Sequence, residues 1–170
     1  MSISPIGFFD SGIGGVSVWK EVTKLLPDEN TIYYADSKNS PYGSKSISEI
    51  QNISITNSNW LIDKGCKLIV VACNTATTNA ISLLRKKFPI PFVGIEPGIK
   101  PAVKKSKKGK IGVLATKGTL SSKLFEKTTK SIDKNNFDII ESHGDGIVEI
   151  IESGDFENDK PKSILIEYLK

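Results

Sequence analysis

The sequence contains few of the residues that build disulfide-rich or metal-rich proteins. It has two cysteines, Cys66 and Cys73, and one histidine among 170 residues. Two cysteines within one segment, in a chain with no secretory signal, argue against a disulfide framework and favour reduced thiols. They are also too few for a zinc site. We therefore expect neither a bound metal nor a disulfide.

Long apolar runs are missing as well. No window approaches the roughly 18 apolar residues that a membrane span needs, and the start of the chain has no basic region followed by an apolar stretch. These absences predict a cytoplasmic protein with no membrane partner. The net charge is +4, and a lysine cluster runs from Lys104 to Lys110 without interleaved aromatics. Since single-stranded nucleic acids bind through basic and aromatic groups together, we expect no nucleic-acid partner.

Short apolar segments alternate with helical signals along the chain. Ser46 has Glu49 three residues later, which is a capping-box spacing, and Gly65 stands where a helix would end. Strand-like runs cover residues 6–10, 31–36, 67–74, 91–96, 110–116 and 137–142. Strands that are apolar on both faces and alternate with helices predict an α/β fold, with mostly parallel sheets covered by helices.

A weak internal repeat indicates two related units. When the sequence is shifted by 105 residues, IGFFDS from Ile6 falls on IGVLAT from Ile111. A match this short also arises by chance between two α/β units, so duplication stays open. We predict a first domain over residues 1–97 and a second over residues 98–170. Alternation demands another strand after the helical segment SILIEYLK, so we expect the second domain to be incomplete, either truncated or completed by a partner chain.

Unusual residues gather at the ends of four predicted strands. They are Asp10 with Ser11, Pro41 to Ser44, Cys73 to Thr75, and Thr116 with Thr119. Each group precedes or opens a helix, where free backbone N–H groups and the helix dipole favour anions. Ligands of parallel sheets bind at the carboxyl ends of the strands. The four groups are therefore predicted to share one site.

The glycine-rich segment after the first strand is not a dinucleotide fingerprint. Gly12, Gly14 and Gly15 give G-x-G-G instead of G-x-G-x-x-G, and Asp10 would place a carboxylate where a pyrophosphate must lie. An acidic side chain beside helix N-termini suits a zwitterion. Asp10 would lie near the ammonium group, with hydroxyls and backbone N–H groups on the carboxylate. This arrangement predicts an amino acid as ligand.

Cys73 has a structural and a functional interpretation. Cysteine is often a small hydrophobic residue in a core. At a helix N-terminus, however, the dipole and nearby N–H donors are expected to lower the pKa of the thiol and make it a base or nucleophile near neutral pH. Asn74 and Thr75 follow directly, with side chains that suit a substrate carboxylate. We favour the functional interpretation.

Five ordered segments resemble the glutamate racemase family of the aspartate/glutamate racemase superfamily. They are GFFDSGIGGVSV, YYADSKNSPYGSKS, VVACNTATTNA, VGIEPGIKPAV and IGVLATKGTLSS, and they extend over most of the chain. The resemblance implies an isomerase that interconverts L- and D-glutamate without a cofactor and supplies D-glutamate for bacterial peptidoglycan. It also implies glutamate as the small-molecule partner, and a homodimer stays open.

The resemblance implies roles for individual residues. Cys73 corresponds to one of two catalytic cysteines, and Asp10 and Glu152 are also implied as catalytic. Two thiols in opposite protonation states, one on each face of the α-carbon, can invert it without a cofactor. The second cysteine lies in a downstream GCTH segment that this sequence does not contain. The implied substrate-binding positions are Asp10, Ser11, Pro41, Tyr42, Gly43, Asn74, Thr75 and Thr116.

Two alternatives stay open at this point. One is another enzyme of the superfamily, such as an aspartate or hydantoin racemase or a decarboxylase. The other is an amino-acid-binding fragment without catalysis, which the missing second cysteine favours. His143 could serve as a general base, but its position favours a strand-end residue near the cleft or the surface.

Overall fold

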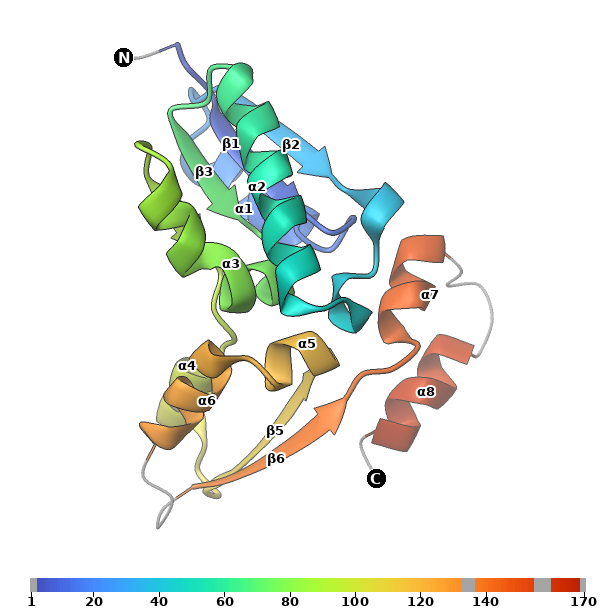
Figure 1. Cartoon of the computed structure of the whole chain (residues 1–170). Coiled ribbons are helices and arrows are strands. Elements are labelled where there is room, and N and C mark those ends of the chain that lie inside the picture. Colours follow the sequence, from blue (N-terminus) through green and yellow to red (C-terminus); the bar gives the residue numbers. More distant parts are fainter. Residues whose placement is uncertain (1–2, 133–136, 155–159, 169–170) are drawn as a thin grey trace.

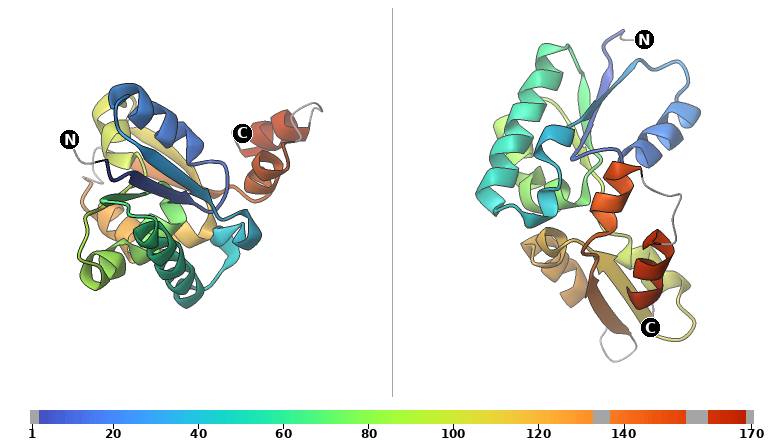
Figure 2. Two further views of the ribbon diagram at one scale, coloured as in Figure 1. Left: turned by 90° about the horizontal axis from the view of Figure 1, so that it is seen from above. Right: turned by 90° about the vertical axis from the view of Figure 1, so that its right-hand side faces the viewer.

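The computed structural model describes residues 3–132, 137–154 and 160–168, and its strands form two parallel sheets (Figure 1). The first sheet has the strand order β2-β1-β3-β4, and the second pairs β5 with β6. Every strand pairing in the two sheets is parallel. The two units are stacked one on the other, as two directions of view show (Figures 1 and 2). The predicted α/β class with mostly parallel sheets is confirmed.

The first unit alternates strands and helices. Its elements are β1 (Ile6–Asp10), α1 (Val16–Leu25), β2 (Thr31–Ala35), the 3-10 turns η1 (Ser37–Asn39) and η2 (Tyr42–Ser44), α2 (Ile47–Asp63), β3 (Leu68–Val71), α3 (Asn74–Lys87) and β4 (Phe92–Gly94). All four predicted strands of this unit are present. The third is shorter than predicted, because Cys73 caps α3 and Asn74 is already helical.

The sheet of the first unit is buried on both faces. Phe8 and Phe9 are neighbours on β1 and point to opposite faces, yet neither is exposed to solvent. Phe9 packs in the cluster that α2 and α3 close, and Phe8 packs in a cluster that includes Val18 and Trp19 of α1. This double burial explains why the strands read as unbroken apolar runs.

The predicted helix signals in the first unit are confirmed. Ser46 caps α2, and the Ser46 and Glu49 side chains each bond the other residue's backbone N–H. After α2 the chain turns through Gly65, whose φ of +80° is in the left-handed region. A glycine adopts this conformation without the steric cost that a Cβ brings.

The second unit has a smaller sheet. Its elements are α4 (Ile99–Lys105), β5 (Lys110–Ala115), α5 (Lys117–Leu120), α6 (Lys123–Lys130), β6 (Asp138–His143), α7 (Ile147–Ser153) and α8 (Lys160–Tyr168). One face of the sheet packs against residues of α4, α5 and α6. On the other face Leu114 is 40% exposed and Ile140 is 54% exposed. This sheet is therefore well covered on one face only.

The chain passes from one unit to the other between β4 and α4, where the proposed division after residue 97 falls. The predicted helix near the C-terminus is present as α8. Within the described ranges, no helix combines the length and the apolar character needed to cross a membrane. The same residues include no cluster of three or more histidine, cysteine or acidic side chains able to hold a metal ion.

Candidate active site

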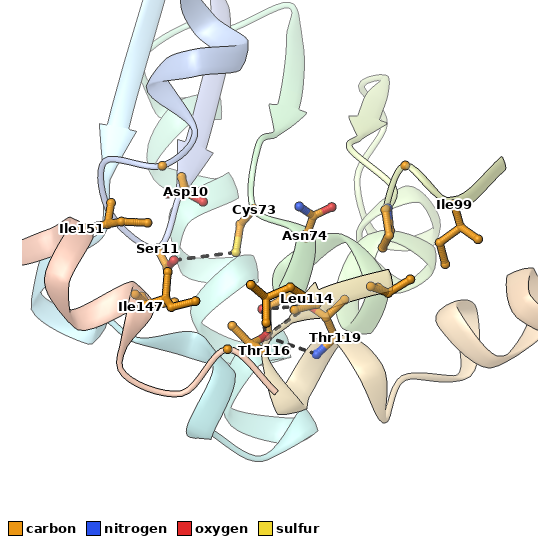
Figure 3. Close-up of a pocket in the computed structure, with 18 of the residues that line it drawn as sticks. Asp10, Ser11, Cys73, Asn74, Ile99, Leu114, Thr116, Thr119, Ile147 and Ile151 are labelled. Atoms are coloured by element: carbon orange, nitrogen blue, oxygen red, sulfur yellow. Dashed lines mark hydrogen bonds between the residues drawn. The ribbon is translucent and has the colours of Figure 1, made fainter. Parts of the chain in front are cut away.

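A pocket of about 550 Å³ lies where the two units meet (Figure 3). The ends of β1, β3 and β5 open into it, as expected for the carboxyl ends of parallel strands. Six of the predicted site residues line it from these strand ends, and Glu152 lines it from α7. The predicted residues in its lining are Asp10, Ser11, Cys73, Asn74, Thr75, Thr116 and Glu152.

Cys73 occupies the N-cap of α3. Its Sγ accepts a hydrogen bond from the backbone N–H of Ala76 at 3.4 Å, and its thiol lies 3.8 Å from the Ser11 Oγ (Figure 3). The side chain is only 6% exposed. The thiol is therefore held in one place, between the N-terminus of a helix and the loop that follows β1.

The expectation of a lowered thiol pKa is wrong. Burial, and then the negative charge of Asp10, raise the pKa of Cys73 to about 11, although hydrogen bonds from Ala76 and Ser11 act in the opposite direction. The cost of removing a thiolate from water outweighs the helix N-terminus here. Cys73 is consequently a neutral thiol near pH 7, and its thiolate is a stronger base than a free cysteine thiolate.

Asp10 ends β1 and organises the loop that follows. Its Oδ2 accepts from the N–H groups of Gly12 at 3.0 Å and Gly15 at 3.2 Å. A Cβ on Gly15 would lie 2.8 Å from the Cβ of Asp10, so glycine permits this close turn. Tyr33 fixes the other side of the loop by donating to the Gly12 carbonyl at 2.9 Å. The carboxylate is thus held at the pocket wall.

Three threonine hydroxyls join the two units beside the pocket. Thr75 of α3 lies 2.9 Å from Thr116 and 3.2 Å from Thr119, measured between Oγ1 atoms, and Thr116 donates to Thr119 at 3.2 Å. Asn79 extends the junction by donating to the carbonyl of Gly118 at 2.9 Å. The hydroxyls of the two units therefore form one continuous hydrogen-bonded group.

Glu152 reaches from α7 to the first unit. Its two carboxylate oxygens lie 3.1 and 3.3 Å from the backbone nitrogen of Ile13, which donates to them. Ile147 and Ile151 of the same helix line the pocket and close its side with apolar surface (Figure 3). Helix α7 thus contributes one acidic group and a hydrophobic wall.

The structure places Pro41, Tyr42 and Gly43 outside this pocket. The Tyr42 side chain is completely buried, and its hydroxyl bonds Asp36 and Asn57 in the interior. Pro41 and Gly43 line a neighbouring pocket of about 130 Å³. The phenol of Tyr42 therefore faces the core of the first unit and has no access to a ligand.

Thr119, which was predicted at this site together with Thr116, lines the pocket and belongs to the threonine group. Other residues of the lining were not predicted. Ile147 and Ile151 gave no signal, because only the packing of α7 brings them there. His143 is exposed at the end of β6, and Cys66 is a free, buried cysteine whose Sγ packs against Gly7 in the core.

Comparisons with known proteins agree with this arrangement. The family model described as Asp/Glu/Hydantoin racemase matches residues 13–162. The glutamate racemase of Cupriavidus pinatubonensis is 45% identical over 98% of this chain and 61% of its own length. That of Clostridium botulinum strain Langeland is 46% identical over 100% of this chain and 65% of its own. The chain thus spans less than two thirds of the length of these curated relatives.

Solved structures give the same result. Escherichia coli glutamate racemase, in complex with L-glutamate and the activator UDP-MurNAc-ala, superposes with a TM-score of 0.87 at 36% identity, covering 98% of this chain and 65% of that one. Isoform RacE1 from Bacillus anthracis gives 0.85 at 33% identity, over 98% and 62%. Because the family model matches most of the residues, the chain belongs to the Asp/Glu/Hydantoin racemase family.

Proposed function

We propose that the chain carries the substrate-binding and proton-abstracting part of a glutamate racemase that works without a cofactor. The observation that carries the proposal is the placement of Cys73. Its thiol is held at the N-terminus of α3, at the wall of a pocket that also exposes an acidic side chain, an amide and hydroxyls. These are the groups that an amino-acid zwitterion needs.

The proposed binding mode assigns each charge of the substrate a partner. Asp10 would attract the ammonium group. The exposed Asn74 amide and the N–H groups in the first turn of α3 would bind a carboxylate, since these N–H groups have no intrahelical carbonyl. Ser11, Thr75 and Thr116 would contact the rest of the substrate from the pocket wall. Pro41, Gly43 and the backbone of Tyr42 would contact only the part of the substrate that extends past Thr116, which lines both pockets, toward the neighbouring one.

Because the Cys73 thiol is neutral in most molecules near pH 7, the proposed reaction begins in the small fraction whose thiol has lost its proton to solvent. The active species is the Cys73 thiolate. It takes the α-proton of glutamate and becomes a thiol, and the electron pair of the broken C–H bond stays on the α-carbon. An acid on the opposite face then protonates that carbon and inverts it. Asp10 raises the basicity of the thiolate, which favours abstraction from a weakly acidic carbon. Glu152 would support the acid of the opposite face.

The acid of the opposite face is proposed to be a second thiol. Cys73 is the one thiol among the described residues that line the pocket, since Cys66 lies in the core. A single thiol can remove and return a proton on the same face, which exchanges the proton with solvent but does not invert the carbon. We therefore expect the 170-residue chain by itself to exchange the α-proton of one enantiomer slowly, with retention of configuration.

Glutamate is the proposed substrate because the relatives with the highest identities reported above are glutamate racemases. A role in supplying D-glutamate for peptidoglycan, in the cytoplasm, is part of the same proposal. The aspartate racemase homologue from Pyrococcus horikoshii shares the fold, with a TM-score of 0.57 at 18% identity. That likeness does not favour aspartate.

Binding of an amino acid without turnover is a second candidate. The neutral Cys73 thiol and the absence of another thiol from the described pocket residues favour it. The two candidate functions predict different outcomes of one experiment. The chain is incubated with L-glutamate or D-glutamate in D₂O, exchange at the α-carbon is followed by NMR, and the enantiomers are separated by chiral chromatography.

Deuterium incorporation into one enantiomer, with its configuration retained, is the expected result. Binding without incorporation would support the second candidate. Robust formation of the opposite enantiomer would show that these 170 residues contain a second acid, and His143 would be the first residue to replace. If neither enantiomer binds, the proposal of a glutamate site on this chain is wrong.

A further inference from the structure

A buried polar cluster lies behind the loop that carries Pro41 and Gly43. Its centre is Asp36, which directly follows β2 and is only 3% exposed. The carboxylate accepts from the Tyr42 hydroxyl at 2.5 Å, from the Asn39 amide at 2.9 and 3.0 Å, and from the Asn57 amide at 3.3 Å. None of the ion pairs found among the described residues includes Asp36. Neutral donors alone thus satisfy this buried charge.

Tyr42 is the donor with the shortest bond in the cluster. Its hydroxyl also accepts from the Asn57 amide at 2.9 Å, so the phenol is bonded on both sides. Burial, and then the hydrogen bond to Asp36, raise the pKa of Tyr42 far above its ordinary value. The phenol therefore stays protonated and continues to donate. Asn57 itself is 3% exposed and is held by α2.

The cluster is connected to both halves of the pocket wall. The backbone N–H of Asp36 donates to the carbonyl of Asp10 at 2.9 Å. On the other side, Gly43 follows Tyr42 and packs tightly against the second unit. A Cβ on Gly43 would lie 2.6 Å from the Cβ of Thr116, and a Cβ on Gly118 would lie 3.1 Å from the Gly43 carbonyl oxygen. A displacement of Tyr42 would thus move the loop against α5.

We propose that Asp36 and Asn57 are positioning residues. They hold the Tyr42 phenol, fix the backbone of Pro41 to Ser44 against Thr116, and thereby set the affinity of the pocket for its substrate. Neither residue lines the pocket, so each acts through Tyr42. The part of this inference that concerns affinity rests on the proposed glutamate site, whereas the part that concerns loop position does not.

The test uses two variants and one matched control in the 170-residue chain. Tyr42→Phe removes one hydroxyl and keeps the aromatic ring in the core. Asp36→Asn removes the charge and keeps the shape. Ser58→Ala is the control, because Ser58 neighbours Asn57 on α2, is fully buried, and its hydroxyl donates to the carbonyl of Ser54 in its own helix. It removes a buried hydroxyl outside the cluster.

The first measurement is amide hydrogen exchange at Lys45, whose N–H donates to the Tyr42 carbonyl at 3.1 Å. We expect the Lys45 amide to exchange at least about tenfold faster in Tyr42→Phe than in the unmodified chain. In Ser58→Ala, we expect any change at Lys45 to be no larger than the change at amides of other loops. The second measurement is glutamate binding by calorimetry. We expect the Kd to rise by about tenfold in Tyr42→Phe and by as much or more in Asp36→Asn.

The outcomes separate the two proposals. Unchanged Lys45 exchange in folded Tyr42→Phe would overturn the positioning role whether or not glutamate binds. If exchange rises in this variant while its Kd stays that of the unmodified chain, the effect on affinity is refuted. If the unmodified chain binds no glutamate, the proposed function fails, and the exchange measurement still decides the position of the loop. Should Asp36→Asn not fold, Tyr42→Phe carries the test alone.

Discussion

The two units of the chain differ in how fully their sheets are covered, and this difference separates their roles at the pocket. In the first unit both faces of β1 are buried, and Asp10 and Cys73 extend from strands that helices enclose. In the second unit, one face of β5 and β6 leaves Leu114 and Ile140 largely exposed. The groups proposed for proton transfer thus extend from the sheet that is buried on both faces, and the second unit supplies contacts across the junction.

Replacing Cys73 should have the largest effect on activity. Cys73→Ala should reduce α-proton exchange of glutamate by about 10²- to 10⁴-fold, because it removes the positioned base. Cys66→Ala is the matched control, since it removes the other buried thiol and leaves the pocket intact. Exchange is measured by NMR in D₂O. Equal losses in the two variants would contradict the assignment of Cys73.

The difference in coverage can be tested with one apolar residue from each sheet, buried in the first and exposed in the second. Phe9→Ala, which empties a fully buried site in the first unit, should lower the free energy of unfolding by about 3–5 kcal/mol. Ile140→Ala, at an exposed site in the second unit, should change it by only about 0.5 kcal/mol. Urea titrations followed by circular dichroism measure both. Similar losses would mean that the two sheets are equally covered in solution.

The role of Asp10 can be separated from that of acidic residues in general. Asp10→Asn should lower the exchange rate by about 10²-fold, because the amide neither attracts the substrate ammonium group nor raises the basicity of Cys73. Asp138→Asn, at the exposed start of β6, is the control and should leave the rate unchanged. If Asp10→Asn has no effect, the ammonium group binds elsewhere.

The raised pKa of Cys73 predicts a small dependence of stability on pH. The folded thiol titrates near 11, whereas an unfolded thiol titrates near its ordinary value of about 8.5–9. The contribution of the protonated thiol to the free energy of unfolding is therefore complete below pH 8. It is lost as the pH rises toward 11, because the unfolded chain releases the thiol proton first. Between pH 7 and 10 it should fall by about 1–2 kcal/mol relative to Cys73→Ala. Urea titrations at the two values measure this, and equal slopes for both proteins would contradict the raised pKa.

The sequence predicted the backbone plan because local rules decide it. Strands of a buried parallel sheet are apolar on both faces, which makes them visible in the sequence. The N-terminal cap of α2 involves only Ser46 and Glu49, which are three residues apart. The convergence of Asp10, Cys73 and Thr116 also followed from a local rule, since carboxyl ends of parallel strands meet at one edge.

What depends on long-range packing could not be predicted. The pKa of Cys73 moved upward because burial and the nearby charge of Asp10 arise only in the folded chain. The buried orientation of Tyr42 depends on Asn57, which is 15 residues away on another element. Ile151 reaches the pocket because α7 packs across the junction, and no spacing in the sequence indicates this contact.

The threonine group at the junction also limits the direction in which its protons can point. Three hydroxyls share three protons, and Thr116 donates to Thr119. If all three contacts form, Thr119 must donate to Thr75, and Thr75 to Thr116, so the ring has a single sense. If one of these hydroxyls donates to a bound carboxylate instead, the hydrogen bond that it made within the ring is lost. The loss of that bond offsets roughly 0.5–1.5 kcal/mol of the binding free energy. In the first turn of α3, the N–H of Ala76 donates to the Cys73 Sγ, so the N–H groups of Asn74 and Thr75, which have no carbonyl acceptor within the helix, are the ones left to an anion.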